Sequence, residues 1–467
     1  MGIVVALVAS FYKLSEAPAI WYDEGFYMQI GMNFAERGEQ VLQTAPGVYA
    51  PTSYITVGFP LIIPLALSYK MFGVGVVEGR TVMALFLLGF IACTYLLARN
   101  LYGKDLAPWT LFLLATFPML YGNGKAVLGE VPGLFFFVAT LLSLWHLEKT
   151  GFKDWKWYVL TGLTAGLCVA TKPFFLLLLG ALCITLIIRW RKITLDWRGV
   201  AAGVVALCIP LGIWVTLQFG GDASIEGVFT GYTNPYAIEN LPTHILQNAL
   251  RLVTESTPLY TVGLIFIWGM SFIVRRKNSA ISSVEVVAFV FCIFTLLSYL
   301  RLEGWYRYLF PATVIALAFL PIATERFTSF ITNRIQILSS VRWMPYVALL
   351  LLSLAQLYQT ARSSYVAQYY GSMRTETLSQ YLPTLRDQSV FLYNTPELGI
   401  LLTTSKYYQY LSPLPNVIIG KETLPLLEES IPDIVLINLE TYEEEQGLFN
   451  KYNKVETVDR YAVLKRR

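Results

Sequence analysis

The chain has 467 residues, of which 55% are hydrophobic and only 14% are charged. A soluble globular protein has about 25% charged residues, so this composition excludes an ordinary soluble domain and indicates many membrane-spanning helices. The net charge is only +4, and the Lys and Arg residues cluster in short loops, which is typical of membrane orientation and not of nucleic-acid binding. All five cysteines lie inside apolar runs without CxxC spacing, so neither disulfides nor a thiolate metal site is expected.

Apolar runs along the chain predict about eleven transmembrane helices. The first is 1–11, and the others are 80–99, 107–123, 131–147, 156–171, 174–190, 199–219, 257–274, 284–300, 308–324 and 343–360. The first run is shorter than the roughly 20 residues that a bilayer requires. We interpret it as the remnant of a helix that enters from the cytoplasm. A signal peptide is less consistent, because no basic region precedes the run and no cleavage motif precedes Asp23.

The loops between these runs alternate in charge. Basic residues gather in 99–104, 149–156, 189–198, 275–277 and 326–342, and the positive-inside rule places these loops in the cytoplasm. The apolar segment 55–72 is interrupted by Pro60 and Pro64. If it crossed the membrane, every later basic loop would face outward, so we predict that it is interfacial or re-entrant. Residues 12–79 then form the first external loop.

Ionisable residues near the ends of apolar runs gather on the predicted outer face. They are Asp23, Glu24, Lys125, Glu130, Lys172, Arg301, Glu303 and Arg307. Such residues are costly at membrane depth and often mark function. Each also has a simpler explanation: the loop acids are merely solvated, Lys172 and Arg307 reach lipid head groups, and Glu130 caps the helix that follows it.

Acids beside cations on an external membrane face suit one kind of chemistry. Lys and Arg bind a phosphate leaving group, while a carboxylate takes the proton of an acceptor hydroxyl. A lipid-linked sugar phosphate is such a substrate. Aromatic residues such as Trp21, Trp305 and Tyr308 would stack on sugar rings, or they belong to the aromatic belt found at membrane surfaces.

The order of several short motifs resembles that of GT-C membrane glycosyltransferases, in the branch of protein O-mannosyltransferases and lipid A aminoarabinose transferases. The motifs, which span roughly residues 1–330, are Trp21-Tyr22-Asp23-Glu24, Phe72-Gly73 followed by Arg80, Lys125-Ala-Val-Leu-Gly-Glu130, Thr171-Lys172-Pro173 and Arg307-Tyr308-Leu-Phe-Pro311. One motif departs: Val57-Gly58-Phe59-Pro60 stands where the family has a Glu-Lys-Pro or His-Pro-Pro type sequence, so only the proline matches.

The resemblance implies roles for the three acids. Asp23 matches the general base, and Glu24 matches the neighbour that orients the site. Glu130 stands where the family has a second acid, usually Asp, that contacts the sugar or the acceptor. A divalent cation held by these three carboxylates is an alternative to a site without metal or cofactor.

The resemblance also implies roles for the cations. Lys125 replaces a basic residue that precedes the second acid, and Lys172 and Arg307 match positions that bind the donor phosphate. We add Arg301 to the predicted substrate-binding residues from its location alone, and Tyr308 as an aromatic residue of the Arg307-Tyr308 motif that would stack on a sugar ring.

The chain changes character after residue 361, where charges return. Runs at 389–393, 416–419, 433–438 and 460–465 read as strands, and stretches that begin at Pro396, Glu422 and Tyr442 read as helices. This pattern predicts a small extracytoplasmic α/β domain at 361–467, with a lid, acceptor-docking or purely structural role.

We therefore predict a polytopic α-helical membrane protein of GT-C type, with a transmembrane domain at 1–360. The predicted activity is inverting transfer of a sugar from a polyprenyl-phosphate donor to an external hydroxyl of a lipid, glycan or protein. The predicted location is the plasma membrane. The competing hypotheses are a transporter or flippase for a lipid-linked anionic sugar, which would be expected to show internal repeats, and a structural scaffold.

Overall fold

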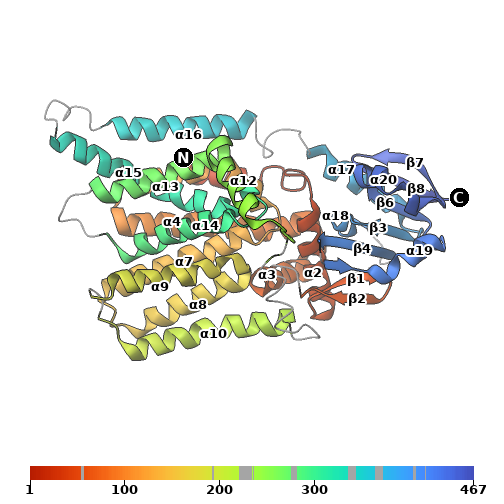
Figure 1. Cartoon of the computed structure of the whole chain (residues 1–467), viewed down its shortest axis with the longest axis horizontal. Coiled ribbons are helices and arrows are strands. Elements are labelled where there is room, and N and C mark those ends of the chain that lie inside the picture. The colour runs from red at the N-terminus through yellow and green to blue at the C-terminus, as the bar shows by residue number, and fades with distance from the viewer. Residues whose placement is uncertain are drawn as a thin grey trace.

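The computed structural model describes residues 1–53, 57–191, 194–219, 234, 236–274, 281–334, 343–362, 372–402, 406–415 and 417–467. Several predicted features lie outside these ranges. They are the start of the segment 55–72, the strand residue Asn416, and the basic residues Lys192, Arg275, Arg276, Lys277 and Arg342. Figure 1 shows a bundle of roughly parallel helices, with an α/β domain at one end of the bundle.

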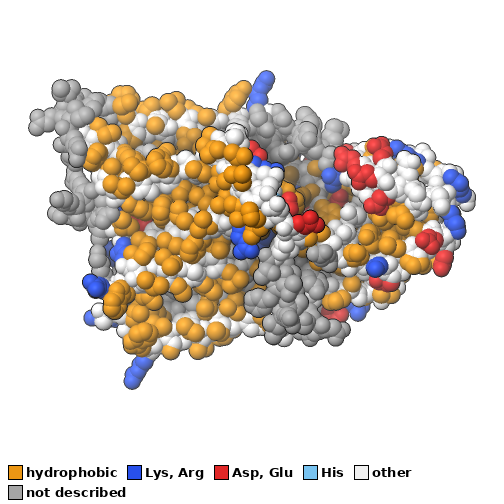
Figure 2. Space-filling view, viewed as in Figure 1, with side chains coloured by type: hydrophobic (Ala, Val, Ile, Leu, Met, Phe, Trp, Pro, Cys, Tyr) orange, Lys and Arg blue, Asp and Glu red, His pale blue; other side chains and the backbone are white. Residues whose placement is uncertain are grey.

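The bundle contains most of the apolar runs. Its helices are α1 (Gly2–Phe11), α4 (Val76–Tyr102), α5 (Ala107–Thr116), α6 (Pro118–Lys125), α7 (Glu130–Lys149), α8 (Trp155–Thr171), α9 (Leu176–Arg189), α10 (Trp197–Phe219), α13 (Ser256–Val274), α14 (Ser283–Tyr299), α15 (Phe310–Arg334) and α16 (Met344–Arg362). Figure 2 shows that hydrophobic side chains dominate the visible face of the bundle, whereas charged side chains are frequent on the α/β domain. This distribution is that of a multi-pass membrane protein.

Six helices of the described chain are long and apolar enough to cross a bilayer: α4, α7, α10, α13, α15 and α16. The predicted count of about eleven spans is therefore not confirmed. The predicted span 107–123 is two helices, α5 and α6, because Pro118 lacks an amide hydrogen and forces the preceding Phe117 into an extended conformation with ψ of 109°.

Small residues allow helices α8 and α10 to approach closely. A Cβ atom added to Gly162 would collide with the carbonyl oxygen of Gly203 on the facing helix, and one added to Gly199 would collide with the ring of Tyr158. Association through small residues is common between helices in membranes, where dispersion contacts replace the hydrophobic effect.

The segment between α1 and α4 lies at the end of the bundle that faces the α/β domain (Figure 1). It contains α2 (Tyr22–Arg37), a hairpin of β1 (Val41–Ala45) and β2 (Val48–Pro51), and α3 (Phe59–Phe72). The sequence predicted an external loop with an interfacial or re-entrant segment here, but it did not predict the hairpin. Helix α3 has 14 residues, about 21 Å at 1.5 Å per residue, which is too short for a hydrocarbon core of about 30 Å.

The C-terminal domain is a six-stranded mixed sheet of order β5-β4-β3-β6-β8-β7. Its strands are β3 (Val390–Tyr393), β4 (Tyr407–Leu414), β5 (Val417–Ile419), β6 (Ile434–Asn438), β7 (Tyr452–Val458) and β8 (Tyr461–Arg466). Strand β3 is parallel to β4 and β6, and β8 is antiparallel to β6 and β7. The short helices are α17 (Ser372–Tyr381), α18 (Pro396–Gly399), α19 (Pro425–Glu428) and α20 (Leu439–Glu444). The small α/β domain is thus confirmed.

Two strands of this sheet were not predicted. Strand β7 shows mostly polar, exposed residues at the sheet edge, and β4 includes Gln409, Ser412 and Pro413, so neither has a continuous apolar pattern. In contrast, the fully buried β3 alternates between two apolar layers. Val390 and Leu392 pack toward α17, and Phe391 and Tyr393 pack toward α19.

The C-terminal domain packs directly on α2 and the hairpin. Gln29 of α2 donates to the carbonyl of Pro396 at 2.6 Å and bonds to Gln409, and Gln43 of β1 donates to the carbonyl of Tyr407 at 3.2 Å. Gly25 of α2 faces the backbone of Glu397 so closely that a Cβ atom has no room. Helix α2 therefore lies between the bundle and the C-terminal domain.

Candidate active site

The first turn of α2 carries both acids of the Trp21-Tyr22-Asp23-Glu24 motif. Carboxylates are favourable there because unpaired amide groups leave partial positive charge at a helix N-terminus. Consecutive helical residues point about 100° apart, so neighbours in sequence face different surroundings. Asp23 and Glu24 accordingly pair with different cations.

Glu24 forms a fully buried ion pair with Arg80 of α4. The Nε atom of Arg80 donates to Oε1 at 2.8 Å, and its Nη2 atom donates to Oε2 at 2.7 Å. Neither side chain is exposed to solvent. The amide of Val127 also donates to Glu24, and Arg80 donates to the carbonyl of Leu14. This two-point contact fixes the start of α2 against the bundle.

Lys125, the last residue of α6, belongs to the same buried region. Its ammonium group donates to the carbonyl oxygen of Tyr12, and its side chain is buried. Burial and the nearby charge of Arg80 lower the pKa of Lys125 to about 7. The structure therefore places Lys125 beside the Glu24–Arg80 pair.

Asp23 pairs with Arg307, which lies in a short 3-10 turn before α15. The two side chains keep 25% and 17% of their surface exposed, so both are accessible to a ligand. The guanidinium carbon of Arg307 lies 5.4 Å from the ring centres of Trp305 and Tyr308 and 5.7 Å from that of Trp21. Burial opposes its charge, but Asp23 and Glu130 outweigh burial and raise the pKa of Arg307.

A second ion pair joins Glu130, the first residue of α7, to Lys172. The Nζ atom lies 2.5 Å from Oε1, and both side chains are almost fully buried. Lys172 is extended, with φ of −155° and ψ of 126°, because Pro173 disfavours a helical conformation in the residue before it. Helix α8 thus ends at Thr171, and the side chain of the following residue, Lys172, reaches Glu130. Burial lowers the pKa of Lys172, Glu130 opposes that change, and Arg307 adds to it.

These two ion pairs form one cluster, which consists of Asp23, Glu130, Lys172 and Arg307. The charge of Arg307 acts on both Glu130 and Lys172. The cluster also has spare hydrogen-bonding capacity, since the Oε2 atom of Glu130 and the Nε atom of Arg307 are buried with no partner among the described residues. A buried polar atom without a partner is costly, so these atoms favour a polar ligand.

Two other predicted residues lie at the edge of this cluster. Tyr308 contacts Arg307, and its hydroxyl hydrogen-bonds to that of Tyr236. Arg301 is exposed in the turn after α14, and no ion pair among the described residues includes it. The structure therefore does not bring Arg301 into the cluster.

The three acids do not converge as a metal site would require. Asp23, Glu24 and Glu130 each contact a different cation, and within the described ranges no group of three or more His, Cys, Asp or Glu side chains is placed to hold a metal ion. In this arrangement the three carboxylates do not form a common set of ligands, and a divalent cation at this site stays a prediction.

Sequence reasoning did not assign roles to Arg80 and Tyr236. A signal for Arg80 was present, because an arginine in the first turns of an apolar helix needs a buried partner. Tyr236 has no comparable signal, since its contact with Tyr308 depends on a loop whose path the sequence does not specify.

Comparisons with known proteins agree with this architecture. Residues 60–214 match the family model described as dolichyl-phosphate-mannose-protein mannosyltransferase. An uncharacterized protein of Aquifex aeolicus (strain VF5) is 28% identical over 225 residues, which cover 46% of this chain and 43% of that protein. The match thus spans less than half of that relative.

Solved structures resemble the chain over nearly its whole length. ArnT from Cupriavidus metallidurans in the apo state is 16% identical with a TM-score of 0.66, and the match covers 99% of this chain and 96% of ArnT. The same protein bound to undecaprenyl phosphate is 17% identical with a TM-score of 0.65, covering 99% and 97%. An oligosaccharyltransferase from Archaeoglobus fulgidus is 12% identical with a TM-score of 0.56, covering 96% of this chain and 69% of that one. The chain is therefore a multi-pass membrane protein with the GT-C fold of membrane glycosyltransferases.

Proposed function

We propose that the protein transfers a sugar from a polyprenyl-phosphate donor to an acceptor hydroxyl on the extracytoplasmic side of the membrane. The observation that carries this proposal is the cluster of Asp23 and Arg307 with Glu130 and Lys172, at the end of the bundle that faces the C-terminal domain. The mannosyltransferase family model and the structural likeness to an ArnT that binds undecaprenyl phosphate support this donor class.

The cations bind the donor phosphate in this mechanism. Arg307 and Lys172 are the cations of the cluster, and Arg307 stays charged at all ordinary pH values. Each is paired with an acid that a phosphate would partly replace as a hydrogen-bond acceptor. Binding of the donor therefore loosens the contact between Arg307 and Asp23 and makes the Asp23 carboxylate available.

Asp23 then acts as the general base. The acceptor oxygen forms a bond to the anomeric carbon while the bond from that carbon to the phosphate oxygen breaks. The hydroxyl proton passes to Asp23, and the electrons of the broken bond remain on the phosphate, whose charge Arg307 and Lys172 stabilise. Attack from the side opposite to the leaving group inverts the anomeric carbon.

The proposal is tested by sugar transfer with purified protein in lipid nanodiscs. The donors are a panel of radiolabelled polyprenyl-phosphate sugars, and an envelope extract supplies acceptors. Loss of a general base typically costs about 10²–10⁴-fold in rate, so Asp23→Asn should lose at least about 100-fold. Asp387→Asn, a change at an exposed aspartate of the C-terminal domain, is the matched control and should keep full activity.

Two results would reject the proposal. Full activity of the Asp23→Asn variant would remove Asp23 from catalysis. Tight donor binding without turnover in any variant would favour a transporter of the lipid-linked sugar.

A further inference from the structure

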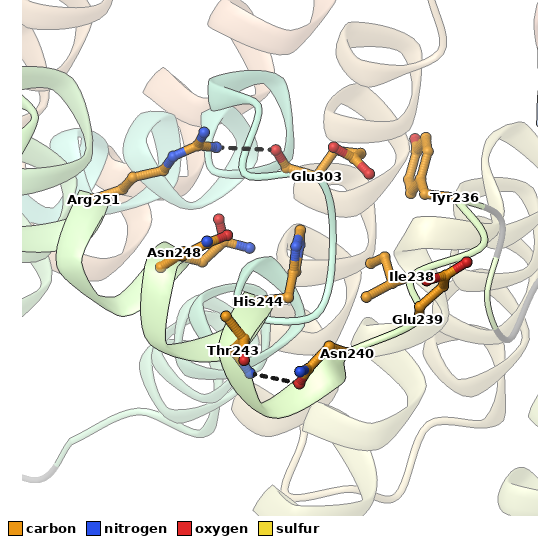
Figure 3. A pocket seen from close by; sticks show the side chains of 10 residues that line it. Tyr236, Ile238, Glu239, Asn240, Thr243, His244, Asn248, Arg251 and Glu303 are labelled. Carbon is orange, nitrogen blue, oxygen red and sulfur yellow. Dashed lines mark hydrogen bonds between the residues drawn. The ribbon is translucent and has the colours of Figure 1, made fainter.

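A cavity of about 440 Å³ opens beside the ion-pair cluster. One wall is α12 (Leu241–Thr254) with the residues that precede it, and the other is formed by Glu303 in the turn after α14. Figure 3 shows the side chains of these walls converging on the space between Tyr236, His244 and Glu303. A volume of this size accommodates a small polar ligand.

The walls of the cavity are fastened together by hydrogen bonds. The Asn248 amide donates to the carbonyls of Tyr299, Leu300 and Leu302, the last at 2.6 Å. His244 bonds to the carbonyl of Leu302 at 2.6 Å, and Arg251 donates to that of Glu303 at 3.1 Å. These hydrogen bonds hold α12 against the turn after α14, so both walls of the cavity are in place before a ligand binds.

The remaining groups of the lining suit hydroxyl-rich ligands. The carboxylates of Glu239 and Glu303, the amide of Gln247 and the hydroxyl of Thr243 accept or donate hydrogen bonds. The ring of Tyr236 provides a flat surface at the same space, and Figure 3 shows it facing the Glu303 side chain. Two carboxylates against the single cation Arg251 disfavour a phosphate here.

Helix α12 has a polar face toward the cavity and an apolar face on the opposite side. The opposite face of α12 exposes Leu246, Leu250 and Val253, which recur at helical spacing, and α12 leads directly into the membrane-spanning α13. A helix with one exposed apolar face and one polar face lies along a membrane surface. We therefore expect the apolar face of α12 to contact lipid, with the cavity beside it at the level of the head groups.

A short series of contacts links the cavity to the candidate base. The hydroxyl of Tyr236 bonds to that of Tyr308, Tyr308 lies against Arg307, and Arg307 pairs with Asp23. Tyr308 therefore contacts both Tyr236 of the cavity lining and the cation Arg307. The lining holds two carboxylates and the single cation Arg251, and it does not include Arg307 or Lys172, so we assign the cavity to the acceptor and not to the donor phosphate.

We infer that this cavity binds a saccharide ring of the acceptor. The inference rests on the proposed function. It assigns the carboxylates of Glu239 and Glu303 and the ring of Tyr236 to acceptor recognition.

A binding experiment tests the inference without any turnover. Saturation-transfer NMR is recorded with protein in nanodiscs and a panel of methyl glycosides of hexoses, pentoses and N-acetylhexosamines. The double variant Glu303→Gln/Gln247→Ala should bind the best glycoside at least about tenfold more weakly, since it loses one charged acceptor and one amide. Glu422→Gln, at an exposed glutamate of the C-terminal domain, should bind like the wild type. Equal binding by the double variant, or no binding of any glycoside by the wild type, would overturn the inference.

Kinetics provide a second readout that separates the two proposals. In the double variant the KM for the acceptor should rise about tenfold while the KM for the donor stays unchanged, and the reverse pattern would overturn the acceptor assignment. Absence of transfer by the wild type with every donor would refute the proposed function. Glycoside binding that depends on Glu303 and Gln247 would in that case still define a saccharide site.

Discussion

Asp23 and Glu24 are adjacent, yet they occupy very different surroundings. Asp23 keeps a quarter of its surface exposed and meets Arg307, whereas Glu24 is fully buried against Arg80. Burying a charge is expensive unless an opposite charge and further hydrogen bonds accompany it, and Glu24 has both. Asp23 is thus the acid available for chemistry, and Glu24 positions it.

The buried side chain of Lys125 predicts that the stability of the protein depends on pH. Its pKa is lowered from 10.5 to about 7 by burial and by Arg80. Between those pH values the unfolded chain keeps a proton that the folded protein has released, so the free energy of unfolding rises with pH, by at most about 1.4 kcal/mol per unit. Thermal unfolding in detergent at pH 7 and pH 9 should therefore show wild type gaining stability relative to Lys125→Met. Parallel pH profiles of the two proteins would contradict this expectation.

At the scale of elements, α2 is held from two sides. Its first turn is fixed to α4 by the Glu24–Arg80 pair, and its middle is fixed to the C-terminal domain by Gln29. The hydroxyl of Tyr22 adds a third contact by donating to Asn394 at 2.5 Å. The direction of Asp23 is therefore determined by contacts that do not include Asp23 itself.

The Glu24–Arg80 pair predicts a large effect of removing one partner. Arg80→Met leaves Glu24 as a buried charge without its cation, which costs about 3–5 kcal/mol. The double variant Glu24→Gln/Arg80→Met should recover part of this loss because no charge is then left unpaired. Arg99→Met, at an exposed arginine of the same helix, is the control and should change the unfolding temperature little. Equal unfolding temperatures for Arg80→Met and Arg99→Met would show that the pair contributes nothing.

The contact between α2 and α18 leaves no room for a side chain at Gly25. A methyl group at this position collides with the backbone of Glu397, which cannot rotate away as a side chain would. Gly25→Ala should destabilise the contact by about 1–3 kcal/mol, as overpacking does, and increase protease cleavage between the bundle and the C-terminal domain. The matched control is Gly212→Ala in α10, where nothing lies within 4 Å of an added Cβ atom. Equal cleavage of both variants would contradict this packing.

The sequence predicted the elements whose residues have one dominant pattern. Apolar length indicated the bundle, and the buried strands β3 and β6 stood out by their continuous apolar runs. Prediction from the sequence failed for elements whose position depends on tertiary contacts or on a single residue. The polar strand β4 is placed by hydrogen bonds such as that between Gln409 and Gln43, and the division of 107–123 depends on the single residue Pro118.

The same reasoning explains what was predictable in the candidate site. Asp23, Glu130, Lys172 and Arg307 are ionisable residues at the ends of apolar runs, and the structure brings all four together. Which acid pairs with which cation depends on helix packing, so the Glu24–Arg80 pair and the outlying position of Arg301 were not predictable from spacing.

At the scale of the whole molecule, the cluster lies where the bundle meets the C-terminal domain, and the proposed function requires this end to face outward. Impermeant maleimide labelling of intact cells checks the orientation, in a background without the five native cysteines. Cysteine at position 443, from Glu443→Cys in the exposed part of α20, should react from outside. Cysteine from Lys153→Cys, in the exposed loop before α8, should react only after the membrane is permeabilised. The opposite labelling pattern would place the C-terminal domain in the cytoplasm.

The pairing of Asp23 with Arg307, and of Tyr22 with Asn394, has a consequence for biosynthesis. The ribosome synthesises α2 before the cation Arg307 and the C-terminal domain, which follow 284 and 372 residues after their partners Asp23 and Tyr22. The nascent protein therefore carries its acids without their full set of partners during most of translation. If translation stops before Arg307, the first helices are made, but the candidate site cannot assemble because the partner of Asp23 is missing.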